Sequence, residues 1–491
     1  MSLLGRSLRA AVCTFMVLCG SVAAVTTAEA GPSCHPEGRA LRYVVAFDRG
    51  TSEAEARAAV TGGCGSTTVY YPQIAVAVAT SADQAFAELV RPAAAFSAQA
   101  ERLAVQRANG TPSIKTPSTK TPSAKTPAAK TAPARAALEP TDPAKVPSAD
   151  RTDEQWDMRA IGADKARMIE PGSPDVVVGV LDSGIDATHP DLAAALDPGK
   201  SAGCLTGAPD RNWAATTSVH GTHVAGIIAA ADDGKGVTGV APGVRVASVK
   251  VIDDRGYADP EAAVCGLMWA VSQGMTVTNS SYFVDPWSLS CAHDDERGVV
   301  NEVMARAVEY STSAGTLNVA AATNEAVGLV PSPRSGARTQ AEGCQALPAG
   351  LRDVVAVSSV SEERVKAGYS SYGLGVIDVA APGGETGQCV LSTVPGGYAP
   401  LCGTSMAAPH VAGVAALLAS KHPGYSARQL RGALDAQATP IACPADYDLT
   451  GDGVQDAYCT GYAGFNGFYG HGMVDALAAV APRRTGSNPA R

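Results

Sequence analysis

The chain has 491 residues, of which 46% are hydrophobic and 17% are charged. This composition is ample for a large folded core, and the length allows two or three domains. The formal net charge of −9 at pH 7 argues against nucleic acid or an anionic membrane surface as the main partner.

The first 30 residues have the features of a secretory signal peptide. Arg6 and Arg9 precede an apolar run over 10–25, and residues 28–30 have the small-x-small form of a cleavage site. No other segment has 18 uninterrupted apolar residues. We therefore expect a soluble, secreted, extracellular protein, monomeric and without a membrane anchor.

The 12 cysteines support an oxidising compartment. Two lie in the signal segment, two lie between 31 and 108, and eight follow position 200, so disulfides can form within each part. Metal ligation is the alternative, but the sequence has no Cys-x-x-Cys pair. Proximity alone suggests that Cys389 pairs with Cys402 and Cys443 with Cys459.

Residues 31–108 carry the pattern of a small α+β domain. A helix is expected over 52–60, because Ser52 can cap it and Glu55, three residues on, completes a capping box. Strands are expected over 42–47, 67–71 and 74–80, and a second helix over 81–90.

A five-residue repeat of the form Thr-Pro-Ser-x-Lys begins at Thr111. It holds proline and lysine at fixed spacing and hardly any large apolar residue, so it cannot bury a core. We interpret 109–150 as an extended, solvated linker that is open to proteolysis; the alternative is a basic interaction tail. Residues 483–491 are expected to form a disordered tail.

From 151 to 482 the chain alternates buried strands with helices. The run over 176–181 is apolar throughout, as in a strand covered on both faces. The alternation predicts an α/β domain with a mostly parallel, doubly wound sheet and helices on both faces. Further strands are expected over 244–252, 275–278, 317–322, 353–360 and 376–380, with helices over 223–231, 259–272 and 298–311.

Polar residues follow three of these strands at the point where each strand ends. They are Asp182, Asn279 and Asn324. The carboxyl ends of the strands are where sheets of this kind bind ligands, so a site is expected there. Taken alone, an acid before glycine is more often a turn former.

Two further segments hold residues that could carry chemistry. His220 and His223 open a helix of small residues and could ligate a metal at helical spacing, but the Glu of a His-Glu-x-x-His zinc site is absent. Ser405 opens an apolar and therefore buried helix, in which Pro409 is tolerated if the helix starts at about Ser405. Ser405 could be an N-cap, or a nucleophile beside unpaired backbone N–H groups.

Together, Asp182, His220 and Ser405 supply an orienting carboxylate, a base and a nucleophile. Their segments read Asp-Ser-Gly-Ile-Asp, His-Gly-Thr-His-Val-Ala-Gly and Gly-Thr-Ser-Met-Ala-Ala-Pro-His-Val-Ala-Gly. On these motifs the chain resembles the subtilisin-like serine peptidases over about 153–480. The resemblance implies a secreted endopeptidase that needs no cofactor for its chemistry. Ser405 would attack the scissile carbonyl of a protein or peptide, His220 would act as base and then acid, and Asp182 would orient His220.

Asn324 lies in the stretch Ala-Ala-Thr-Asn-Glu, which resembles the oxyanion-binding segment of this family. The resemblance implies that the Asn324 side chain and the Ser405 N–H hold the tetrahedral oxygen. Thr323 departs from the family pattern, because glycine usually precedes the oxyanion asparagine.

The segment expected to line the substrate groove runs through Ser281, Tyr282 and Phe283. In the family a Ser-Leu-Gly type of sequence stands there, so Phe283 replaces a glycine that lets the substrate backbone lie close. We expect a narrowed primary pocket and a preference for small side chains.

The domain at 31–108 stands where the family carries its prodomain, a ferredoxin-like inhibitor and folding aid. This implies a self-processing zymogen, with its own prodomain as intramolecular inhibitor and a maturation cut before about Asp153. Two alternatives stay open. One is a binding protein on a peptidase fold with an occluded groove, and the other is a peptidase whose main cut is its own activation.

The loop over 448–456 resembles an EF-hand-type calcium loop. Position 12 of the loop is Cys459 in place of the bidentate Glu, so the alternative is a disulfide-closed turn. The candidate ligands of a structural calcium ion are Asp448, Thr450, Asp452 and Asp456.

Overall fold

The computed structural model describes residues 34–109, 145–291, 295–330 and 344–481. The expected signal peptide, most of the expected linker and the expected tail lie outside these ranges. Among the described residues, none of the helices combines the length and the apolarity that a bilayer span requires.

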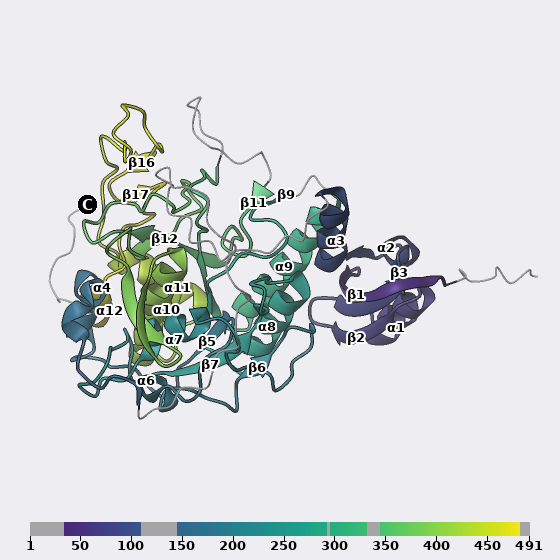
Figure 1. Cartoon of the computed structure of the whole chain (residues 1–491), viewed down its shortest axis with the longest axis horizontal. Helices are drawn as coiled ribbons and strands as arrows, with labels where there is room; N and C mark the ends of the chain where they lie inside the picture. Colours follow the sequence, from purple (N-terminus) through teal and green to yellow (C-terminus); the bar gives the residue numbers. More distant parts are fainter. Residues whose placement is uncertain (1–33, 110–144, 292–294, 331–343, 482–491) are drawn as a thin grey trace, which may run out of the picture.

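The N-terminal part, which we call the N-terminal module (34–109), is a βαββαβ unit followed by a helix (Figure 1). Its antiparallel sheet has the strand order β2-β3-β1-β4, which is ferredoxin-like. Ser52 and Glu55 form the expected capping box on the first helix. The elements are β1 (Pro36–Ala46), α1 (Glu53–Gly62), β2 (Ser66–Tyr71), β3 (Val76–Asp83), α2 (Phe86–Leu89), β4 (Ala94–Phe96) and α3 (Ala98–Asn109).

The helix predicted over 81–90 was mostly wrong. β3 continues to Asp83, whose carboxylate accepts hydrogen bonds from the backbone N–H groups of His35 (2.8 Å) and Ala85 (2.9 Å). The bond to His35 ties the end of β3 to the start of β1, and the helix is reduced to the single turn α2. The sequence reading also missed β4 and α3.

The main body contains a seven-stranded parallel sheet with the order β13-β12-β10-β8-β5-β7-β6. This confirms the predicted doubly wound α/β fold, and each predicted strand is present with ends shifted by up to three residues. The strands are β5 (Val177–Asp182), β6 (Ala202–Gly203), β7 (Arg245–Lys250), β8 (Val277–Ser280), β10 (Leu317–Ala321), β12 (Val354–Val360) and β13 (Val379–Pro382).

Long helices cover both faces of this sheet (Figure 1). One face is covered by α7 (His220–Ala229), α10 (Thr404–Lys421) and α11 (Ala427–Gln437). These helices share a core with the β5 residues that point to this face, such as Val180. On the other face, α8 (Pro260–Ser272) and α9 (Asp295–Ser313) pack against Leu181 and its neighbours. Adjacent residues of β5 therefore serve opposite cores, as expected for a strand buried on both sides.

Short elements complete the body and connect the layers. The helical ones are η2 (Thr152–Glu154), α4 (Trp156–Ala160), α5 (Ala163–Ala166), α6 (Pro190–Ala193) and α12 (Ala476–Val480). The strands are β9 (Ser290–Cys291), β11 (Cys344–Gln345), β14 (Val390–Val394), β15 (Gly397–Leu401), β16 (Gly461–Tyr462) and β17 (Phe465–Asn466).

The N-terminal module lies beside α8 and α9 (Figure 1) and shares their core. Val44, Ile74 and Phe96 belong to the same buried cluster as apolar residues of both helices. Arg306 of α9 is 9% exposed and donates to the carbonyl oxygens of Phe47 (2.7 Å) and Ile74 (3.1 Å). The module is therefore joined to the body by apolar packing and by buried polar contacts.

The expected linker reached to 150, but its last described residues are part of the body. Val146 is buried, and Ala149 O accepts a hydrogen bond from Gly236 N (3.0 Å). Arg151 N donates to Gly236 O (2.7 Å), which continues the pairing. A buried valine holds this segment in place, so the packed chain begins before the predicted boundary.

Disulfides tie several parts of the described chain together. The pairs Cys389–Cys402 and Cys443–Cys459 were predicted and are confirmed. The bond between Cys34 and Cys64 stays within the N-terminal module. Another bond, Cys204–Cys265, joins the segment after β6 to α8.

Candidate active site

Two of the predicted catalytic residues form a hydrogen-bonded pair where β5 ends and α7 begins. His220 Nδ1 lies 2.8 Å from Asp182 Oδ1 and 2.9 Å from Asp182 Oδ2. An ionised carboxylate only accepts hydrogen bonds, so Nδ1 carries the hydrogen and Nε2 is left as the basic nitrogen. The Asp182 side chain is fully buried, whereas the imidazole is 28% exposed and can meet a ligand.

The same pairing sets the proton affinity of the imidazole. Burial is the largest single influence and lowers the pKa of His220, but the charge and the hydrogen bond of Asp182 together outweigh it. The pKa of His220 is therefore raised above the ordinary value of 6.5. A raised pKa makes Nε2 a stronger base at neutral pH.

Ser405 is the second residue of α10, close to the predicted helix start. Its hydroxyl donates to Ser281 O at 3.2 Å, and no hydrogen bond to His220 is recorded within the described chain. Pro409 falls in the second turn and not, as expected, in the first. Because Pro409 has no N–H, the carbonyl of Ser405 lacks its helical partner, and Ser281 Oγ donates to it at 2.9 Å.

Asn324 follows β10 and faces the start of α10. Its Oδ1 accepts hydrogen bonds from Thr404 N (2.9 Å) and Thr404 Oγ1 (2.8 Å). A backbone N–H can only donate, so this contact identifies Oδ1 and makes Nδ2 a donor beside the turn at 403–405. A Cβ placed on Gly403 would lie 3.3 Å from Nδ2, which shows how closely the amide approaches that turn.

Thr323 holds an unusual backbone conformation next to Asn324. Its φ is +77°, a left-handed value that β-branched residues rarely adopt. Ser371 supports it twice, because Thr323 Oγ1 lies 2.8 Å from Ser371 Oγ and Thr323 O accepts from Ser371 N at 3.1 Å. The glycine-to-threonine departure is thus accommodated by a partner that the sequence alone did not reveal.

The predicted groove segment lies beside Ser405. Ser281 is buried and bonded to Ser405 in both directions, as described above. Tyr282 is half-buried and packs against the core that includes α8 and α9, and burial raises the pKa of its hydroxyl. Phe283 lines a cavity of about 340 Å³. The effect of Phe283 on substrate preference stays a prediction.

The cavity itself, and the helix α3 that lines part of it, were not predicted from the sequence. α3 of the N-terminal module covers one side, and loops of the body form the rest. Helical spacing of charged and apolar residues over 98–109 was the signal that could have revealed α3. The lining residues are Glu101, Arg102, Val105, Tyr257, Phe283, Asp285, Pro286, Trp287, Ser288 and Glu325.

The expected calcium loop is an exposed turn closed by the Cys443–Cys459 disulfide. The Asp448 carboxylate accepts backbone N–H groups, among them those of Gly451 and Gly453 at 2.7 Å each. Asp452 and Asp456 likewise accept N–H groups of the loop, and Thr450 Oγ1 lies 3.3 Å from Asp448. Within the described ranges, no group of three or more His, Cys, Asp or Glu side chains is placed to hold a metal ion. Calcium binding stays an untested prediction.

The chain resembles known proteins over the region that contains this site. The profile described as the Subtilase family matches residues 173–472. Subtilisin NAT of Bacillus subtilis subsp. natto is 34% identical over 307 residues, which is 62% of this chain and 66% of that protein. Subtilisin of Bacillus pumilus shows the same identity, and 91% of its length is covered. A crystal structure of a lanthipeptide protease superimposes with a TM-score of 0.54 and 28% identity, covering 67% of this chain and 94% of that one.

Proposed function

The chain belongs to the subtilase family of serine-type endopeptidases, and from this premise we propose that it cleaves proteins or peptides through an acyl-enzyme on Ser405. The observation that carries the proposal is the hydrogen bond between buried Asp182 and His220, which leaves Nε2 of a part-exposed imidazole as the base. A serine hydroxyl is a weak nucleophile until such a base takes its proton.

In the proposed reaction, Ser405 Oγ leaves its hydrogen bond with Ser281 O and turns toward His220. Oγ then bonds to the scissile carbonyl carbon while its proton passes to Nε2. His220 returns the proton to the departing amine, and the C–N bond breaks. Water repeats the sequence on the acyl-enzyme and restores the serine.

The negative oxygen of the tetrahedral intermediate needs hydrogen-bond donors. We assign this role to Asn324 Nδ2 and the backbone N–H of Ser405. The proposal is supported by the fixed orientation of Asn324, whose Oδ1 is held by Thr404. Donors that are already in place cost no rearrangement when charge develops.

We further propose that the protein is secreted as a zymogen in which the N-terminal module is the inhibitor. The contact of the module with α8 and α9, and the contribution of α3 to the lining of the cavity beside Phe283, support this role. The disulfides fit an oxidising compartment. Cleavage between the module and the body would then activate the enzyme.

The test is intact mass and N-terminal sequencing of the exported protein, with wild type beside Ser405→Ala. We expect the wild type to lose the module and the variant to keep it. Retention by both, or identical loss from both, would argue against self-processing by Ser405. Fluorogenic peptides then separate an externally activated peptidase, which turns them over, from a binding protein, which does not.

The preference for small side chains is tested on the activated enzyme. Peptides that differ only in the residue before the scissile bond are compared for wild type and Phe283→Gly. We expect kcat/KM to favour alanine over phenylalanine in the wild type, and the ratio to move toward phenylalanine by about tenfold in the variant. Efficient wild-type cleavage after phenylalanine would contradict a narrowed pocket.

A further inference from the structure

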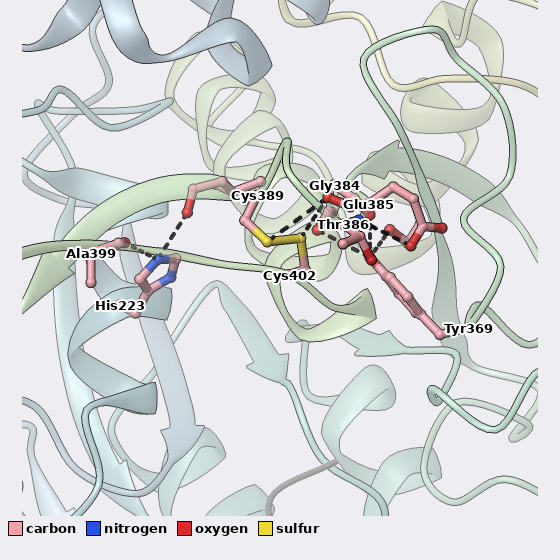
Figure 2. The surroundings of a disulfide bond; sticks show 11 residues. His223, Tyr369, Gly384, Glu385, Thr386, Cys389, Ala399 and Cys402 are labelled. Atoms are coloured by element: carbon pink, nitrogen blue, oxygen red, sulfur yellow. Dashed lines mark hydrogen bonds between the residues drawn. A yellow bond between two sulfur atoms is a disulfide. The ribbon is translucent and has the colours of Figure 1, made fainter. Parts of the chain in front are cut away.

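The hairpin formed by β14 and β15 connects the two helices that carry His220 and Ser405. Its first strand, β14, packs against α7, and the hairpin leads through Cys402 into the turn before α10 (Figure 2). We propose that this hairpin, closed at its base by the Cys389–Cys402 disulfide, is a positioning element that fixes Ser405 relative to His220. The inference rests on the proposed function.

The contact with α7 is made through polar groups of both strands. His223 Nε2 lies 3.1 Å from Val390 O on β14 and 3.0 Å from Ala399 O on β15 (Figure 2). Burial, followed by the charge of His220, lowers the pKa of His223 to about 3. The ring is therefore neutral, and its Nε2–H donates to the two carbonyl oxygens.

β14 also returns hydrogen bonds to the backbone of α7. Ser392 Oγ donates to His223 O at 2.8 Å, and Thr393 Oγ1 donates to Thr222 O at 2.8 Å. A Cβ at Gly226 would clash with both hydroxyl groups, so the strand and the helix are in closest contact there. The hairpin cannot shift without moving the helix that begins with His220.

At its other end the hairpin is joined to the turn at 403–405, which carries the proposed nucleophile. Cys389 directly precedes β14 and Cys402 directly follows β15, with their Cα atoms 4.7 Å apart. The next residue, Gly403, donates its N–H to Gly383 O at 3.0 Å. Ser405 is only three residues beyond Cys402, so little chain is left in which a displacement could be absorbed.

The neighbouring loop holds the disulfide in place. A Cβ at Gly384 would lie 3.0 Å from Cys402 Sγ, and the Tyr369 hydroxyl donates to Gly384 O at 2.6 Å (Figure 2). The disulfide is thus packed against an anchored loop. A shift of about 1 Å in a catalytic group can cost about 10²-fold in rate, so such anchoring matters for turnover.

The second disulfide of the C-terminal region is a matched control for stability. Cys443–Cys459 closes a loop of sequence separation 16, and Cys389–Cys402 one of 13. Loops of similar length stabilise the fold by similar amounts through the entropy of the unfolded chain. Cys443–Cys459 lies in the turn that carries Asp448 and not in the hairpin.

The experiment compares the activated wild type with Cys389→Ser/Cys402→Ser and Cys443→Ser/Cys459→Ser. Two quantities are measured: kcat and KM on a chromogenic tetrapeptide, and the rate at which a fluorophosphonate labels Ser405. All assays are run below the melting temperature of the least stable of the three proteins. We expect both variants to lose melting temperature. Only Cys389→Ser/Cys402→Ser should also lose kcat and labelling rate, by about 10- to 100-fold, with KM within about threefold.

Equal kcat in the two double variants would overturn the inference. If Cys389→Ser/Cys402→Ser does not fold, Ser392→Ala/Thr393→Val keeps the disulfide and removes the two hydrogen bonds to α7. Its kcat should fall at least threefold, and an unchanged kcat would again overturn the inference. A wild type that neither turns over peptide nor labels at Ser405 refutes the proposed function instead.

Discussion

At the scale of single residues, the proton affinity of His220 determines the expected pH dependence. A protonated imidazole cannot accept the proton of Ser405, so activity is lost as pH falls through the pKa of His220. Because Asp182 raises that pKa, kcat/KM should increase with pH through a midpoint above 6.5. A midpoint clearly below 6.5 would contradict the described pairing.

Asp182→Asn tests the origin of this behaviour. The amide removes the negative charge, and it can donate to Nδ1 and so favour the wrong tautomer of His220. We expect kcat to fall by about 10⁴, the magnitude known for this change in a Ser-His-Asp triad, and the midpoint to move to lower pH. The pH profile of kcat/KM measures both effects.

Asn324→Ala should reduce kcat with little change in KM, because the amide acts on charge that develops only in the transition state. The expected loss is about 10²- to 10³-fold, which is the value measured for the equivalent change in subtilisin itself. Thr323→Gly is the matched control, since it restores the residue usual in the family and keeps the amide. Comparable losses in both variants would mean that backbone geometry, and not the amide donor, was disturbed.

At the scale of elements, Lys366 joins the C-terminal segment to the sheet. Its ammonium group is fully buried, donates to Ser370 O at 2.7 Å, and lies within 5.1 to 5.4 Å of three aromatic ring centres. Two of these rings, Tyr447 and Phe468, belong to the C-terminal segment, and Tyr447 also donates to Lys366 O at 2.7 Å. Burial lowers the pKa of Lys366 to about 7, against the opposing charges of Glu385 and Asp456.

This shift predicts a stability that increases with pH. Between pH 7 and 10.5 the unfolded chain holds a proton on Lys366 that the native protein lacks, so raising the pH favours the native state. Lys366→Met should flatten the dependence of the unfolding free energy on pH over this window. Denaturant unfolding in a Ser405→Ala background measures it without autolysis.

Lys235→Met serves as the control, because the Lys235 side chain is 61% exposed. We expect it to leave the pH dependence of the unfolding free energy unchanged. Equal slopes for the wild type and Lys366→Met would show that Lys366 keeps its proton throughout this range.

Elements whose pattern is local were predicted well from the sequence. β5 is apolar on both faces and α1 carries a capping box, so both could be recognised without tertiary information. The helix over 81–90 was mostly lost to a long-range contact, the bonds of Asp83 to the start of β1. The sequence explained only in part how α10 tolerates Pro409. The missing N–H of Pro409 is replaced by the hydroxyl of Ser281, which is distant in sequence.

The candidate site shows the same division. Asp182, His220, Asn324 and Ser405 were identified because each stands in a specific motif, and the expected proximity of Asp182 and His220 is present in the structure. Ser371 could not be predicted, since only the φ of Thr323 creates the need for a supporting partner. The cavity beside Phe283 depends on α3, which comes from a different part of the chain.

At the scale of the whole molecule, two arginines connect the N-terminal module to the start of α8. Arg42 Nε lies 3.0 Å from Glu261 Oε1, and Arg102 binds Asp259 through two nitrogen atoms at 2.5 and 2.9 Å. Both carboxylates are less than a tenth exposed. Removing one partner of a buried pair costs about 3–5 kcal/mol, because the other charge stays desolvated.

We therefore expect Arg42→Ala/Arg102→Ala to weaken docking of the module by at least about 10²-fold. The measurement uses Ser405→Ala with an engineered protease site between 110 and 144, and follows co-elution of module and body after cleavage. Arg49→Ala is the control, since Arg49 pairs with Glu309 at 2.8 Å but both side chains are more than half exposed. Such pairs contribute about 0–1 kcal/mol, so its effect should stay within about fivefold. If the parent protein, the double variant and Arg49→Ala co-elute equally, Arg42 and Arg102 do not contribute to docking.

The packing of the module on α8 and α9 has a consequence for the handling of the mature protein. In the proposed maturation the module is removed, and these helices would lose the cover that Val44, Ile74 and Phe96 give them. Contiguous apolar surface of this kind promotes self-association and adhesion. The purified mature enzyme should therefore adsorb to hydrophobic resins and vessel walls more strongly than its precursor, and its colloidal stability at high concentration should be lower.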